Sequence, residues 1–290
     1  MGETVLNRGL SDEFLSSLQS GSMAPIICAA KTYGLDLQIR EDYINLYHRG
    51  LSLLKLTHSR RGSYRAEINL KFLPGVQLPG EIRRGACYAT FDADDLFARQ
   101  YSTSVAAVSA NADRHVGSER SAEQSLVRGS LHAGSAVVII DRQVQLHGLR
   151  KCADVIGITR EDEPRLIIGE LKYGLDRRIP RISEQLGHYY RMLTDPDGRL
   201  AQNVADVYRR VIEQKCRLHV LPGDVSFPAR SPRVECLAIL CDYSPRRPLL
   251  EEARAAAEGC GFAVRLVQPT GPDYEVPPVD EWEKLCPQRT

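Results

Sequence analysis

Two neighbouring apolar stretches that carry charged residues constrain this 290-residue chain more than any other feature. The first, 153–158, contains Asp154, and the second, 165–173, contains Glu170 and Lys172. A polar turn separates them, which predicts a β-hairpin. Because side chains alternate between faces along a strand, Glu170 and Lys172 are expected to lie side by side on one face.

A carboxylate and an ammonium group inside an apolar strand need partners, because burying an unpaired charge is costly. A divalent cation shared by Asp154 and Glu170 would provide one, since Mg²⁺ takes oxygen ligands from one or two carboxylates, water and substrate phosphate. Lys172 could then hold an attacking water and counter the charge that develops on phosphorus oxygens. The hairpin therefore predicts a metal-dependent nuclease site.

The Glu-x-Lys spacing alone carries little weight, because the chain contains it twice. Glu213, Gln214 and Lys215 repeat the spacing, but the apolar residues of 203–215 recur at helical intervals. We interpret this second copy as an exposed helix face. Of the two copies, only the one with Glu170 lies in a predicted hairpin whose other strand also carries an acidic residue, Asp154.

Composition excludes several classes of protein. The hydrophobic content of 43% suits one large or two modest packed domains, and the net charge of +1 does not by itself indicate a nucleic-acid-binding protein. No apolar run reaches membrane-spanning length, and no basic region followed by an apolar one opens the chain. The eight cysteines form no CxxC pair. We therefore expect a cytoplasmic protein with reduced thiols and no membrane partner.

The order of patterns predicts an α/β protein in three parts. Residues 1–112 contain a short helix and several alternating stretches, typical of a β-rich α+β region. Residues 113–270 read as helix, three strands, two helices, strand, helix and strand, which implies a mixed β-sheet flanked by helices. Residues 271–290 are rich in proline and are expected to form a tail packed on the surface.

The element order and the charged hairpin resemble the PD-(D/E)XK nuclease superfamily, which has a restriction-endonuclease-like fold. The resemblance covers roughly 117–245 and is carried by Asp154, Glu170 and Lys172. Ala153 replaces the proline of the motif, a change that removes no ligand. The resemblance implies that Asp154, Glu170 and the Leu171 carbonyl hold Mg²⁺ or Mn²⁺ while Lys172 orients a water.

The helix that follows the second strand resembles the Gln-x-x-x-Tyr helix of the RecB-like branch, with Gln185 and Tyr189 on one face. These two residues could contact nucleic acid or support Lys172; the alternative is that Tyr189 is simply a core residue and Gln185 a surface residue. Three arginines that directly follow the site are also expected to bind nucleic acid. They are Arg177, Arg178 and Arg181.

The family also places a carboxylate on the helix before the hairpin. Glu119 and Glu123 both match that position, and their spacing of one helical turn does not choose between them. Asp141 is a weaker candidate, because an aspartate at the end of an apolar stretch usually starts a turn. None of the seven histidines is assigned to the site. The RecB-like branch often has a metal-binding histidine ahead of the helix, and His115 lies near that place, with His132 and His147 as alternatives.

The resemblance implies hydrolysis of phosphodiester bonds, in DNA more than in RNA, in restriction, defence or repair. Residues 1–112 could serve as a target-recognition module or as a dimerisation module. In the second case the protein would be a homodimer. Two alternatives stay open. One is an inactive nuclease-fold module that binds nucleic acid, and the other is a structural protein in which Glu170 and Lys172 only neutralise each other.

Overall fold

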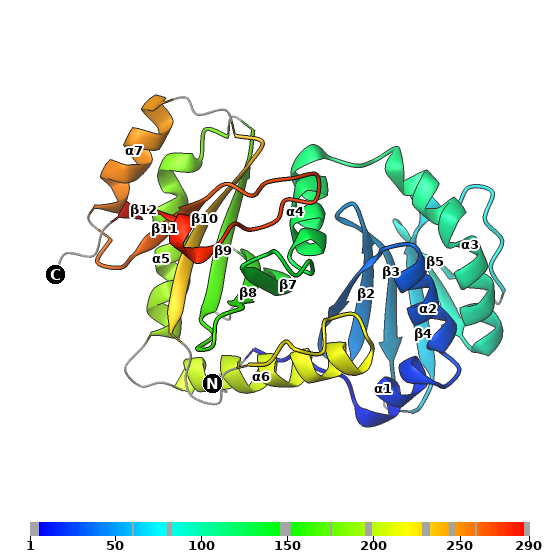
Figure 1. The fold of residues 1–290 in the computed structure, drawn as a ribbon. Helices are drawn as coiled ribbons and strands as arrows, with labels where there is room; N and C mark the ends of the chain where they lie inside the picture. The colour runs from blue at the N-terminus through cyan, green and yellow to red at the C-terminus, as the bar shows by residue number, and fades with distance from the viewer. Residues whose placement is uncertain are drawn as a thin grey trace. The chain divides into compact units, whose positions relative to one another are not determined.

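The computed structural model describes most of the chain and divides it into two compact units (Figure 1). The N-terminal unit comprises Asn7–Gln124 and Arg210–Asp224, and the C-terminal unit is built mainly from Ser125–Arg209 and Val225–Thr290. The described residues are 6–59, 61–79, 83–145, 152–174, 176–194, 199–227, 233–243, 247–258 and 260–286.

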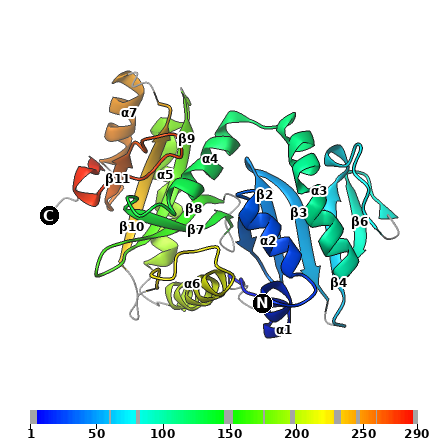
Figure 2. The ribbon, with the colours of Figure 1, turned by 45° about the vertical axis from the view of Figure 1, so that its right-hand side comes forward.

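The N-terminal unit contains a six-stranded antiparallel sheet, as the alternating pattern predicted, with strand order β1-β2-β3-β4-β6-β5. Helices α2 and α3 lie side by side on one face of this sheet (Figure 2). The side chain of Asp94 accepts a hydrogen bond from the Phe97 amide and so caps the start of α3. The elements are α1 (Asp12–Gln19), α2 (Ala24–Thr32), β1 (Asp36–Ile39), β2 (Tyr43–His48), β3 (Leu51–His58), β4 (Tyr64–Asn69), η1 (Leu70–Phe72), β5 (Arg83–Arg84), β6 (Tyr88–Ala93) and α3 (Asp95–Asp113).

The C-terminal unit contains a mixed six-stranded sheet, in the order β12-β11-β10-β9-β8-β7. Neighbours β7, β8 and β9 are antiparallel, β9, β10 and β11 are parallel, and β12 is antiparallel to β11. Its elements, together with helices α4 and α6 that each belong partly to both units, are α4 (Ser118–Gly129), β7 (Val137–Val144), β8 (Ala153–Thr159), β9 (Leu166–Tyr173), η2 (Ile179–Arg181), α5 (Ile182–Leu193), α6 (Arg199–Arg217), β10 (Val234–Cys241), α7 (Arg247–Ala257), β11 (Val264–Val267), η3 (Val279–Glu281) and β12 (Glu283–Cys286).

The predicted α/β class, with a mixed sheet flanked by helices, is confirmed. Helix α5 packs against β9 and β10, behind these strands in the view of Figure 1. Strand β9 is buried from Leu166 to Lys172, as its position in the middle of the sheet requires. Central strands are covered on both faces, which explains why β9 and β10 are nearly continuous apolar runs.

The division into units differs from the expected ranges. The predicted boundary at residue 112 lies inside the N-terminal unit, and two of the observed boundaries fall within helices α4 and α6. The expected surface tail, 271–290, instead contributes strand β12 to the sheet, and Trp282 beside it is buried. An edge strand needs only a few residues with the right register. Such a short strand is difficult to recognise in the sequence when proline-rich segments flank it.

The interpretation of Glu213-Gln214-Lys215 as an exposed helix face was right for the helix and wrong for the exposure. Glu213 is exposed, but Gln214 and Lys215 are buried within the N-terminal unit. The ammonium group of Lys215 donates a hydrogen bond of 3.1 Å to Gln38 on β1. This partner lies far away in sequence, so the local pattern around Lys215 contained no sign of it.

Candidate functional site

The β8–β9 hairpin brings Asp154 and Glu170 to neighbouring positions on adjacent strands. Its register pairs Val155 with Gly169 and Ile156 with Ile168. Asp154 and Glu170 each lie one residue beyond the last of these pairs on their own strand. Both carboxylates therefore lie at the end of the paired part of the hairpin.

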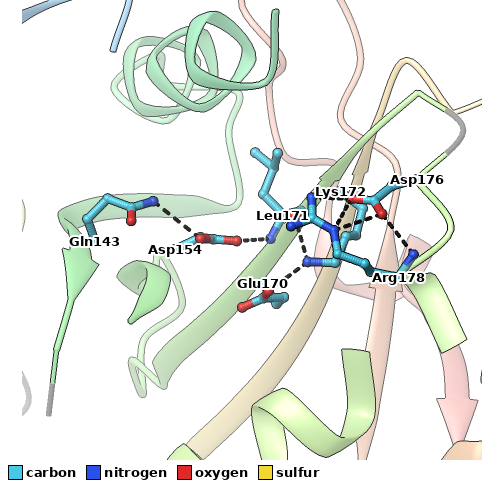
Figure 3. Close-up of polar contacts among 7 residues, drawn as sticks. All are labelled: Gln143, Asp154, Glu170, Leu171, Lys172, Asp176 and Arg178. Carbon is cyan, nitrogen blue, oxygen red and sulfur yellow. Dashed lines mark hydrogen bonds and ion pairs between the residues drawn. The ribbon is translucent and has the colours of Figure 1, made fainter. Parts of the chain in front are cut away.

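Asp154 is held against the backbone of the neighbouring strand. Its Oδ2 accepts a 2.8 Å hydrogen bond from the amide of Leu171, and its Oδ1 accepts one of 3.3 Å from the side chain of Gln143 on β7 (Figure 3). Hydrogen bonds to an ionised carboxylate are stronger than neutral ones. The carboxylate is therefore fixed beside the main chain of Glu170 and Leu171 while remaining partly exposed.

Glu170 and Lys172 form a buried ion pair on the same strand. Lys172 Nζ donates a 2.6 Å hydrogen bond to Glu170 Oε1 and a 3.2 Å hydrogen bond to the Leu171 carbonyl (Figure 3). Only 5% of Glu170 and 1% of Lys172 is accessible to solvent. The prediction that these side chains lie side by side is confirmed, and each provides part of the compensation that burial of the other requires.

Helix α5 brings Tyr189 close to the same carboxylates. Burial raises the pKa of Tyr189 above its ordinary value, and the nearby acidic groups of Cys152, Glu170 and Asp154 raise it further. One helical turn earlier, the Oε1 atom of Gln185 is buried and has no hydrogen-bond partner among the described residues. The Gln-x-x-x-Tyr face therefore lies over the strand that carries Glu170 and Lys172.

Asp176, which sequence reasoning did not single out, belongs to the surroundings of the site. Its carboxylate accepts hydrogen bonds from both the side chain and the backbone amide of Arg178 (Figure 3). Burial pushes the pKa of Asp176 upward, but the hydrogen bonds of Arg178 and the charges of Arg178 and Lys172 outweigh it and leave the pKa below its ordinary value. The only hint in the sequence was an aspartate two residues before an arginine.

The three predicted nucleic-acid-binding arginines lie in and beside η2, directly before α5. Arg177, Arg178 and Arg181 are all exposed. Arg178 is paired with Asp176, and 60% of its side chain remains accessible. These arginines follow the site in the chain and present their charge to solvent.

The two candidate helix glutamates both lie on α4, in the part of that helix that belongs to the N-terminal unit. Glu123 is buried, together with its neighbour Ala122, whereas Glu119 is exposed. The two glutamates therefore differ in burial, and both belong to the unit that does not contain the hairpin.

Asp141 is not the start of a turn, contrary to the prediction. It lies inside β7, is buried, and accepts a 3.2 Å hydrogen bond from the hydroxyl group of Tyr208 on α6. The continuation of β7 through Val144 explains the error, because the polar residues after Asp141 resemble a turn. His115 is exposed, His132 pairs with Glu275, and the third candidate histidine, at position 147, lies outside the described residues.

The donor set of the hairpin fits a hard divalent cation. Asp154, Glu170 and the Leu171 carbonyl supply oxygen atoms, which Mg²⁺ and Mn²⁺ prefer, and water and phosphate commonly complete such sites. Across the described ranges, however, no three acidic, histidine or cysteine side chains group closely enough to hold a metal by themselves. The residues present could therefore provide only part of a coordination sphere.

Comparisons with protein-family models, curated proteins and solved structures found no match. Within the described ranges, no helix is both long and apolar enough to cross a membrane.

Proposed function

We propose that this chain is a divalent-metal-dependent nuclease with a restriction-endonuclease-like core, acting on DNA more than on RNA. The observation that carries the proposal is that Asp154 is bonded to the Leu171 amide, next to Glu170, while Lys172 lies 2.6 Å from the Glu170 carboxylate. Two carboxylates and a lysine at the end of a hairpin form the combination that phosphodiester hydrolysis with a metal requires.

Asp154, Glu170 and the Leu171 carbonyl would hold Mg²⁺ or Mn²⁺, which when bound supplies Lewis-acid stabilisation of a phosphoryl oxygen. Lys172 would orient the attacking water and place a positive charge beside the phosphorus oxygens, where negative charge develops. The bond from the Leu171 amide keeps Asp154 in place during this step.

Helix α5 and the arginines around it would position the nucleic acid. Tyr189 covers the face that carries the carboxylates, and the buried amide oxygen of Gln185 lies one turn away. The exposed guanidinium groups of Arg177 and Arg181 offer charge-assisted contacts to phosphates. Such contacts set register and orientation but carry no sequence information.

A second candidate is an inactive nuclease-fold module that binds nucleic acid. The observation that favours it is the Glu170–Lys172 pair, in which the two buried charges already satisfy each other without a metal. This candidate predicts nucleic-acid binding without cleavage and no Mn²⁺ binding that depends on Asp154 and Glu170.

Cleavage of labelled DNA and RNA in Mg²⁺ or Mn²⁺ tests the proposal. We expect Asp154→Asn and Lys172→Met to lower the rate by about 100-fold or more, the usual scale for removing a group that stabilises the transition state. Lys215→Met is the matched control, because Lys215 is also buried, is also two residues after a glutamate, and lies in the other unit. Equal rates for the two lysine variants at equal folded concentration would reject the proposal.

A further inference from the structure

The side chain of Arg178 is held by Asp176 in the geometry with which arginine binds phosphate. Nε of Arg178 lies 2.9 Å from each carboxylate oxygen of Asp176, and Nη2 lies 2.5 Å from Oδ2 (Figure 3). The planar guanidinium group offers parallel donors that match a carboxylate and a phosphate equally well. Asp176 thus occupies donors that a phosphate group would use.

The two partners differ in accessibility. Arg178 keeps 60% of its side-chain surface exposed, whereas Asp176 keeps 10%. An incoming phosphate can therefore reach the guanidinium group from solvent, while the carboxylate stays in place. Water and salt reach the guanidinium side of this pair and screen the attraction between the two charges there.

Asp176 would keep two partners after such an exchange. Its Oδ1 also accepts a 2.8 Å hydrogen bond from the backbone amide of Arg178, which does not depend on where the guanidinium group points. The ammonium group of Lys172 also acts on Asp176 and favours its charged form. Release of the guanidinium group therefore does not leave an uncompensated carboxylate.

We infer that Asp176 competes with the phosphate groups of nucleic acid for Arg178 and thereby lowers the affinity of this protein for its substrate. The inference rests on the proposed function, because it takes nucleic acid as the ligand. Asp176 acts through Arg178 and is a positioning residue. It holds the arginine beside the strand of Lys172 until a phosphate replaces the carboxylate.

Fluorescence anisotropy with a short labelled DNA, in EDTA so that no cleavage occurs, tests the inference. We expect Asp176→Asn to bind DNA about two- to fivefold more tightly, the factor expected for loss of a competing surface ion pair. The asparagine oxygen can still accept the Arg178 amide, so the local fold is retained. Arg178→Gln should weaken binding and lower the salt dependence by roughly one phosphate contact.

The double variant Asp176→Asn/Arg178→Gln should bind like Arg178→Gln alone, because without the arginine there is nothing to compete for. Glu161→Gln is the charge-matched control: it changes net charge equally in the same unit, but its partner Arg165 is only 14% exposed and keeps a second carboxylate, Glu235, so no exposed arginine is released. An equal gain in Glu161→Gln, or unchanged or weaker binding in Asp176→Asn, overturns the inference. Absence of DNA binding by both wild type and Asp176→Asn would overturn the proposed function as well.

Discussion

Lys172 Nζ lies 2.6 Å from Glu170 Oε1, and both side chains are buried in the C-terminal unit. The two residues of the proposed catalytic strand are therefore paired with each other before any metal or substrate arrives. A cation that binds Glu170 through Oε1 must compete with the lysine for that oxygen atom.

Removing one member of this pair is expected to destabilise the fold more than removing both. Lys172→Met leaves a buried carboxylate without its main partner and should lower the free energy of unfolding by about 3–5 kcal/mol. The double variant Glu170→Leu/Lys172→Met should recover most of that loss, because two apolar side chains carry no desolvation cost. Urea denaturation compares the variants, and a double variant less stable than Lys172→Met would contradict the expectation.

The affinity for Mn²⁺ is expected to rise in Lys172→Met, the variant whose stability is expected to fall. Without the ammonium group, the Glu170 carboxylate is available to a cation, so Lys172→Met should bind Mn²⁺ at least about tenfold more tightly than wild type. A hydrogen bond to a charged group is worth about 1.5–3 kcal/mol, which sets this scale. Calorimetry measures the affinity. Tighter binding that persists when Asp154→Asn is added would show that the Mn²⁺ lies elsewhere.

Gly169 has no room for a side chain. A Cβ atom there would lie 2.7 Å from Cδ1 of Ile239 on β10 and would also clash with Val155 on β8. Gly169→Ala should therefore destabilise the fold by about 1–3 kcal/mol through overpacking. Gly223→Ala is the control, since a Cβ there meets nothing within 4 Å. Equal urea midpoints for the two variants would disprove the prediction.

The Asp176 carboxylate should make stability depend on pH in the acidic range. Its pKa is lower in the folded protein than in the unfolded chain, where it is about 3.9. The stability that the ionised Asp176 carboxylate contributes is therefore fully present above the unfolded-state pKa. It is lost as pH falls through the lower folded-state pKa. Wild type should exceed Asp176→Asn in urea midpoint near neutral pH, and the difference should shrink below about pH 4. A constant difference would contradict the assignment.

Local patterns predicted the hairpin well. The expected strands at 153–158 and 165–173 differ by a single residue from β8 (Ala153–Thr159) and β9 (Leu166–Tyr173). Strand alternation is a property of neighbouring residues, so the shared face of Glu170 and Lys172 followed directly from the sequence.

Contacts between distant segments could not be predicted in this way. The burial of Lys215 depends on Gln38, which is 177 residues away, and the position of Asp141 inside β7 depends on a partner strand and on Tyr208. The role of Asp176 depends on how the chain turns after β9. None of these partners leaves a periodic signal near the residue concerned.

The sequence by itself determined the α/β class, the charged hairpin and the helix that carries Gln185 and Tyr189, because each depends on short-range periodicity. Only the tertiary structure decided that Lys172 is paired with Glu170, that Leu171 holds Asp154, and that Asp176 holds Arg178. Those contacts depend on side-chain distances of about 3 Å, which packing and hydrogen-bond geometry select from many orientations open to the same sequence.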